Sequence, residues 1–136
     1  MFAGLALPIT FGFYQESSLG DQARNLENSL RMAQAMAING RSESSAGVKI
    51  EPTEGFPQGW RYVIFEGESY ENRLRGADMV IPFAVALSTE ETEIVFEKST
   101  GLPDQEAEII LRLGKFSTKI AIDSQGKIER HVTTRL

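Results

Sequence analysis

The sequence predicts an α+β fold in which one long N-terminal helix packs against an antiparallel β-sheet or β-sandwich. Residues 14–39 contain no proline and are rich in helix formers. From residue 48 onward, short β-type runs alternate with glycine- and proline-containing turns. No second helical pattern separates these runs, so we expect antiparallel strands without crossover helices.

Length and composition exclude several classes of protein and of functional site. The 136 residues fit one small domain, and 41% hydrophobic with 24% charged residues is ordinary for a globular chain. The absence of cysteine excludes a disulfide framework, a thiolate zinc site and a cysteine nucleophile. A lone histidine, His131, excludes most histidine-based metal and acid–base sites. The net charge of −5 argues against wholesale wrapping of nucleic acid, although it permits a local basic patch.

Residues 1–14 form an apolar segment without a charged side chain. A spanning helix needs about 20 apolar residues, and a signal peptide needs a basic region and a small-residue cleavage site. Gly4, Pro8 and Gly12 suit neither a soluble core helix nor a central strand, whereas membrane helices tolerate both residue types. We therefore expect residues 1–14 to continue the helix as the exit half of a membrane or filament-core helix and to protrude from the domain. Burial in the core of the domain is the alternative.

Residues 15–40 are predicted to form an amphipathic helix. Leucine and alanine recur at intervals of three and four on one face, at Leu19, Ala23, Leu26, Leu30, Ala33 and Ala37. Met32, Met36 and Ile38 widen this stripe, so the part held by the sheet is expected to be Leu26–Ile38. Charged residues lie on the opposite flank with helical pair spacing, among them Asp21, Arg24, Glu27 and Arg31. Asn39-Gly40 supplies the stop.

The β-rich part of the same domain is expected to cover residues 41–136. The expected strands are 48–51, 60–65, 80–87, 92–97, 107–113, 116–122 and 127–132. Gly114-Lys115 predicts a tight hairpin. Pro82 points to an edge, a bulge or a late strand start. Ile81, Phe83, Val85 and Leu87 alternate with other residues, so one face of that strand is expected to be buried.

Motifs for catalysis are missing from the sequence. It contains no phosphate-binding glycine loop, no nucleophile elbow and no zinc-helix motif. Acidic clusters at Glu66, Glu68 and Glu71 and at Glu90, Glu91 and Glu93 are more typical of solvated loops than of acid–base pairs. Asp104 and Glu106 lack the dense spacing of a calcium loop. We interpret Trp60 as a core residue and His131 as a solvated or satisfied one. The expectation is a protein without catalytic residues, cofactor or metal.

Four stretches, taken in order, carry a resemblance to a known family. They are Leu5-Ala6-Leu7-Pro8, the run from Leu26 to Asn39-Gly40, Ile94-Val95-Phe96 followed by Gly101, and Lys119-Ile120-Ala121-Ile122 through Gly126-Lys127-Ile128. In this order the chain resembles type IV pilin-like proteins. It is most similar to the H-type minor pseudopilins of type II secretion and to FimT-like minor pilins. The basic leader, the peptidase site and the glutamate that follows it in this family are not found in the sequence.

The resemblance implies a non-enzymatic minor subunit that assembles into, primes or caps a type II secretion pseudopilus or a type IV pilus. It also implies other pilin or pseudopilin subunits, an inner-membrane assembly platform and the membrane as partners, and a methylated N-terminus in the full-length family. The location would be the inner membrane with the domain in the periplasm, or a cell-surface filament. The candidate assembly residues on the helix are Leu5, Leu7, Pro8, Leu19, Leu26 and Leu30.

Charge is divided unevenly along the chain. Residues 77–111 contain eight acidic residues against one lysine, whereas residues 112–136 contain six basic against two acidic residues. The six are Arg112, Lys115, Lys119, Lys127, Arg130 and Arg135. They are a candidate patch for a partner subunit or for DNA, or they pair internally across strands. A DNA-binding minor pilin and a soluble β-rich ligand-binding module, whose apolar N-terminus belongs to its core, therefore remain alternative functions.

Overall fold

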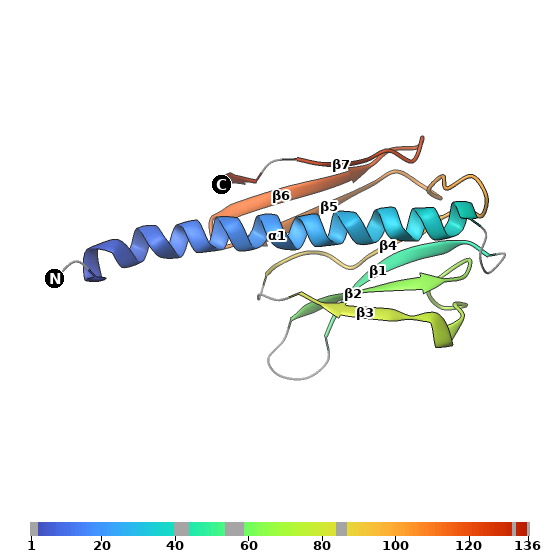
Figure 1. The fold of residues 1–136 in the computed structure, drawn as a ribbon, viewed down its shortest axis with the longest axis horizontal. Helices are drawn as coiled ribbons and strands as arrows, with labels where there is room; N and C mark the ends of the chain where they lie inside the picture. Colours follow the sequence, from blue (N-terminus) through green and yellow to red (C-terminus); the bar gives the residue numbers. More distant parts are fainter. Residues whose placement is uncertain (1–2, 40–43, 54–58, 84–86, 132, 136) are drawn as a thin grey trace.

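The computed structural model describes residues 3–39, 44–53, 59–83, 87–131 and 133–135, with side chains placed from Tyr14 onward except at Arg75 and Arg135. Predictions that involve Phe2, Gly40, residues 54–58, Val85 or Val132 therefore lie outside the described residues, as do the side chains of Leu5, Leu7 and Pro8. Within these ranges the chain forms a long helix followed by eight short strands. The α+β class and the packing of the helix on antiparallel strands are confirmed (Figure 1).

Helix α1, Ala3–Asn39, is continuous through the apolar segment and the amphipathic segment. Its first turns extend beyond the ends of the strands, as expected for residues 1–14 (Figure 1). The buried stripe begins at Leu19 and ends at Ala37. The contact with the strands is thus longer than the predicted Leu26–Ile38. Met32 and Ile38 are 47% and 49% exposed, so the expected widening of the stripe is wrong at these two positions.

The first sheet, named sheet A here, has the strand order β3-β2-β1-β4 in the described part of the chain. Its strands are β1 (Ala46–Pro52), β2 (Trp60–Glu66), β3 (Met79–Pro82) and β4 (Thr92–Phe96), all antiparallel. Pro82 ends β3 at the edge of the sheet, where a missing N–H group is tolerated. β3 is shorter than the predicted strand 80–87, although Phe83 and Leu87 are buried as expected. A short 3₁₀ turn, η1 (Arg75–Ala77), precedes it.

The second sheet, named sheet B, is built around β6. Its strands are β5 (Ala107–Leu113), β6 (Phe116–Ile122), β7 (Ile128–Arg130) and β8 (Thr134–Arg135). β5 pairs with one edge of β6, and β7 and β8 pair with β6 as well. The β5–β6 hairpin is confirmed, since Gly114 adopts the positive φ of 61° that such a turn requires.

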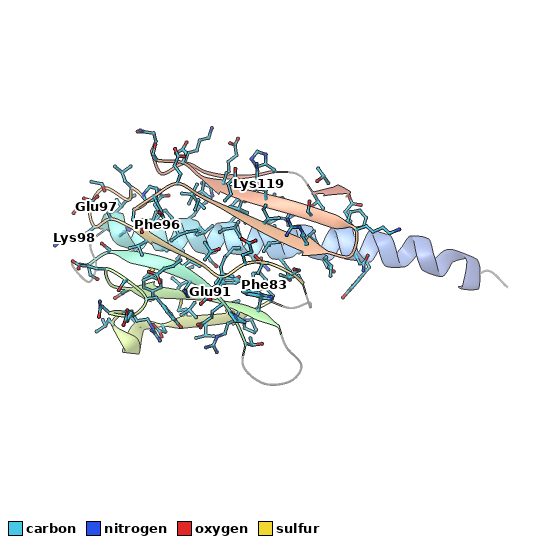
Figure 2. The ribbon with its side chains drawn as sticks, turned by 180° about the vertical axis from the view of Figure 1, so that it is seen from behind. Phe83, Glu91, Phe96, Glu97, Lys98 and Lys119 are labelled. Carbon is cyan, nitrogen blue, oxygen red and sulfur yellow. The ribbon has the colours of Figure 1, made fainter. Side chains whose placement is uncertain are left out.

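Helix α1 packs against both sheets, and one hydrophobic cluster joins all three elements. Ile50, Ile64 and Phe96 face the helix from sheet A, and Ile109, Leu111 and Ile120 belong to the same cluster in sheet B. The segment after Leu87 ties the sheets together, because Ser88 and Arg112 exchange backbone hydrogen bonds of 2.8 and 2.9 Å. The helix lies along one side of both sheets (Figure 1), and the opposite side of the strands faces outward (Figure 2).

Candidate functional site

The first candidate surface is the part of α1 that extends beyond the sheets. Leu5, Leu7 and Pro8 lie in its helical backbone. The segment from Ala3 to Phe13 carries no charged residue, and the first charged helix residue is Glu16. The sequence of this segment has apolar residues on every face of a helical repeat, which is typical of a helix surrounded by apolar groups.

The structure places the other three candidate assembly residues inside the domain. Leu19, Leu26 and Leu30 are each 0% exposed. They pack within the core shared by both sheets. A fully buried side chain cannot contact a second subunit, so these leucines fix the helix to its own domain. Of the six candidates, Leu5, Leu7 and Pro8 precede the buried stripe of α1, which begins at Leu19.

A polar row on α1 attaches sheet B to the helix. Glu27 pairs with Arg31 at 3.1 Å and with Arg130 of β7 at 3.2 Å. Arg31 also donates a hydrogen bond of 2.8 Å to the carbonyl oxygen of Ile128. Arg130 therefore points toward the helix and is half-buried, which removes it from any patch on the outer side of the sheet. The sequence showed the Glu27–Arg31 spacing but gave no signal for the distant partner.

The outer side of sheet B brings two of the six basic residues together. Because β5 and β6 are antiparallel, Arg112 opposes Ser117, and Lys119 opposes Ile110. These side chains alternate with the buried Leu111, Thr118 and Ile120. A shallow groove of about 310 Å³ runs here, and its lining is Ile110, Arg112, Ser117, Thr118, Lys119, His131 and Thr134. Figure 2 shows Lys119 on this side, where it pairs with Glu108 at 3.4 Å.

The remaining basic residues are dispersed. Lys115 is exposed in the β5–β6 turn, and Lys127 is exposed at the opposite end of β6, after the Asp123–Gly126 turn. Arg135 pairs with Phe116 through the backbone, and its side chain lies outside the described set. The six residues thus do not form one patch. The cross-strand pairing weighed from the sequence applies to Lys119, which pairs with Glu108, whereas Arg130 pairs with Glu27 on the helix instead.

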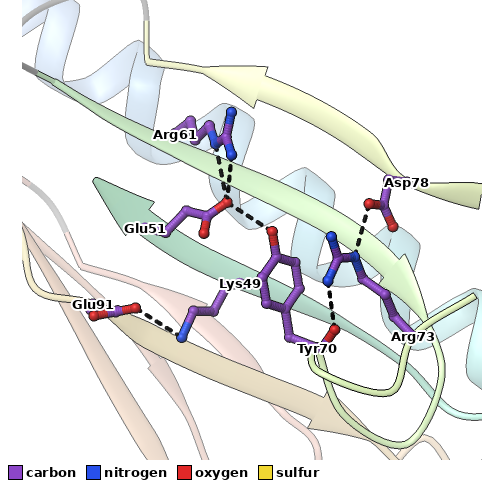
Figure 3. A network of polar contacts seen from close by, with 7 residues as sticks. All are labelled: Lys49, Glu51, Arg61, Tyr70, Arg73, Asp78 and Glu91. Carbon is purple, nitrogen blue, oxygen red and sulfur yellow. Dashed lines mark hydrogen bonds and ion pairs between the residues drawn. The ribbon is translucent and has the colours of Figure 1, made fainter. Parts of the chain in front are cut away.

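A network on the outer side of sheet A was not predicted from the sequence (Figure 3). The loop after β2 folds back over this face, so that the Tyr70 ring packs edge-on against Phe65 with centroids 5.5 Å apart. The Tyr70 hydroxyl donates a 2.8 Å hydrogen bond to Glu51, which also binds Arg61 at 3.0 Å. Burial first, and then the bond to Glu51, raise the pKa of Tyr70. Gly47 makes room for Phe65, because a Cβ there would lie 2.8 Å from the ring.

Arg73 closes this network. Its guanidinium stacks on the Tyr70 ring at 3.8 Å from the centroid, and it donates to Asp78 at 2.8 Å. The bond to Asp78 raises the pKa of Arg73. Every charged group drawn in Figure 3 has a partner within the chain, including Lys49, which pairs with Glu91 at 3.2 Å. We infer that this network holds the loop after β2 against the outer side of sheet A.

The acidic candidates and His131 lie in different places. Glu66 and Glu68 line a depression of about 420 Å³ beside the loop of sheet A, whereas His131 lines the groove of sheet B. Trp60 is half-buried and packs on the core, in line with its interpretation as a core residue. Among the residues whose side chains are placed, no three His, Cys, Asp or Glu residues gather as metal ligands would.

Comparison with protein-family models, with curated proteins and with solved structures finds no match for this chain. Within the described part of the chain, no helix combines the length and the apolar character that crossing a membrane requires.

Proposed function

We propose that the chain is a non-enzymatic, pilin-like minor subunit that assembles into, primes or caps a type II secretion pseudopilus or a type IV pilus. The observation that carries the proposal is the division of α1. Its residues from Leu19 to Ala37 are held by both sheets, while its uncharged first part extends beyond them (Figure 1). The proposal assigns no catalytic residue, cofactor or metal to the domain.

The physical argument concerns the extension. The free energy falls when an apolar surface in water is covered by another apolar surface. Copies or relatives that carry the same extension can cover one another side by side. Head-to-tail contacts of this kind build an open helical filament where the rotation from one subunit to the next does not close a ring. The strands then form the outer part of the subunit, and the helix forms the axis.

The partners of the extension follow from the same argument. Before assembly, the membrane and an inner-membrane assembly platform would hold it. After assembly, other pilin or pseudopilin subunits would surround it. The domain would then lie in the periplasm or on a cell-surface filament.

Single-cysteine cross-linking tests this proposal, because the natural chain has no cysteine. In the cells that produce the chain, Leu7→Cys is expected to cross-link to a second subunit of the filament. The matched control is Lys98→Cys, since Lys98 is exposed in the turn near the far end of α1. We expect no cross-link from this position.

A charged substitution provides the functional counterpart. Leu7→Asp should abolish secretion or piliation and leave the folded domain intact, because position 7 lies outside the region held by the sheets. Normal assembly of the Leu7→Asp variant, or the absence of any cross-link from Leu7→Cys, would overturn the proposal.

A further inference from the structure

Basic side chains gather at the end of the domain from which the apolar part of α1 extends. The β5–β6 turn touches the helix there, because a Cβ on Gly114 would lie 2.5 Å from the amide oxygen of Gln15. Lys115 is exposed in this turn, and Arg112 is exposed on the outer side of the adjoining strand. Tyr14, one residue before Gln15, is 58% exposed. The turn and the tyrosine thus lie together at the C-terminal end of the uncharged segment.

The opposite end of sheet B is acidic. Its exposed carboxylates are Glu106, Glu108, Asp123 and Glu129. Three of them, Glu106, Glu108 and Asp123, line a shallow depression of about 410 Å³. Lys119 lies between the two ends and is paired with Glu108. Apart from Lys127 in the far turn and Arg130, which points toward the helix, charge on this sheet therefore changes from basic to acidic with distance from the apolar segment.

We propose that this basic end, formed by Tyr14, Arg112 and Lys115 and named the headgroup face here, rests on anionic phospholipid headgroups. The inference rests on the proposed function, because the apolar part of α1 must lie in the bilayer to bring the domain to the membrane surface. That segment then also determines which end of the domain faces the membrane.

The chemistry of the face fits a layer of phosphate groups. Lysine and arginine near an anionic membrane each strengthen binding by a factor of about five. Tyrosine is enriched where apolar and aqueous regions meet, as Tyr14 would be. The hydroxyl groups of Ser117 and Thr134, which lie 3.5 Å apart in the groove beside Arg112, supply further hydrogen-bond donors. Glu16 is exposed next to Gln15 and opposes this attraction.

A membrane surface fits this distribution better than a nucleic acid does. DNA binding draws its affinity from basic residues placed along a phosphate backbone. Here the described basic side chains of sheet B that are exposed and without a partner are few, and the carboxylates at its other end would repel phosphates along an extended backbone. A flat headgroup layer perpendicular to the helix would meet the β5–β6 turn, while the exposed Glu90 and Glu91, which lead into β4 at this end of the domain, add to the repulsion from Glu16.

Vesicle sedimentation of the full chain tests the inference. The vesicles contain phosphatidylcholine alone, or phosphatidylcholine and phosphatidylglycerol in equal amounts. We expect tighter binding to the anionic vesicles, with the difference shrinking as salt is raised. The double variant Arg112→Gln/Lys115→Gln should bind anionic vesicles at least tenfold more weakly and neutral vesicles unchanged. Lys127→Gln, which removes an exposed lysine at the far end, is the matched control and should bind like the natural chain.

A substitution of opposite sign sharpens the test. Glu16→Gln should tighten binding to anionic vesicles several-fold. Equal binding of the natural chain to both vesicles would overturn the inference while leaving the membrane-held helix of the proposed function in place. Failure to bind either vesicle would contradict the inference and also the membrane-held helix of the proposed function. The cross-linking at Leu7 tests the assembly into a filament separately. If the double variant keeps its vesicle binding and instead loses retardation of duplex DNA, the face serves nucleic acid and the inference is wrong.

Discussion

At the residue scale, Tyr62 joins the helix to sheet A. Its side chain is buried, and its ring lies 5.1 Å from that of Phe83. Burial raises the pKa of Tyr62 above 10, and a hydrogen bond with Ser29 of α1 lowers it by less. The folded state thus holds the proton on this hydroxyl more tightly than the unfolded state does.

This shift predicts a stability change at high pH. Below the unfolded pKa of 10.0 the tyrosine is neutral in both states and its contribution is complete. As the pH rises further, the unfolded chain ionises first, so the free energy of unfolding falls until the folded pKa is reached. Urea unfolding between about pH 9 and about pH 11 should therefore show a smaller loss for Tyr62→Phe than for the natural chain. Identical pH slopes would contradict this assignment.

At the element scale, α1 shows how a helix shared by two sheets differs from a simple amphipathic pattern. The stripe of leucine and alanine is completely buried. Met36 packs at its border, whereas Met32 and Ile38 are about half exposed, and Ile38 lies beside Gly101 in the loop after β4. Apolar character alone therefore overestimates the width of the buried face, because the strands cover only an arc of the helix.

Leu30 and Met32 form a matched pair for this element. Leu30→Asp places an unpaired charge in the core and should cost about 3 kcal/mol or more of the unfolding free energy. Met32→Asp places the same charge on the exposed side and should change that free energy by less than about 1 kcal/mol. Thermal melts of both variants measure the difference. Equal melting temperatures would show that the helix is rotated relative to the arrangement described.

At the scale of the whole molecule, α1 holds the loops of both sheets at one end. The side-chain amide of Gln34 donates to the carbonyl oxygens of Gly101, at 3.0 Å, and of Gly126, at 2.7 Å. Gly101 follows β4 of sheet A, and Gly126 precedes β7 of sheet B. One side chain thus connects the helix to a loop of each sheet.

Removal of this amide should loosen the assembly of the sheets on the helix. Gln34→Ala leaves two partly buried carbonyl groups without their donor and should lower the unfolding free energy by about 1–3 kcal/mol. Asn28→Ala, at an exposed helix position, is the control and should be neutral or slightly stabilising. Hydrogen exchange would locate the effect in the loops around Gly101 and Gly126. A variant as stable as the control would exclude this role for Gln34.

The elements with strong local signals could be predicted from the sequence. The recurrence of Leu19, Leu26 and Leu30 is a property of a single helix, and Gly114-Lys115 determines its turn through backbone conformation. The candidate assembly residues could be placed on the helix in the same way. Whether a helical leucine faces its own domain or a neighbouring subunit could not be predicted, because either partner is equally apolar.

The sequence by itself determined the α+β class, the helix and the hairpin, because each depends on residues close to one another in the chain. For Pro82 it left an edge, a bulge and a late strand start open, and the strand order decided for the edge. Tertiary structure was required for the division of the strands into two sheets, the folding of Tyr70 over Phe65 and the separation of Arg130 from Arg112. Arg130 turns toward the helix because Glu27, which lies 103 residues away, offers a carboxylate there. Contacts of this kind arise from the relative placement of whole elements, and no local pattern of residue types encodes that placement.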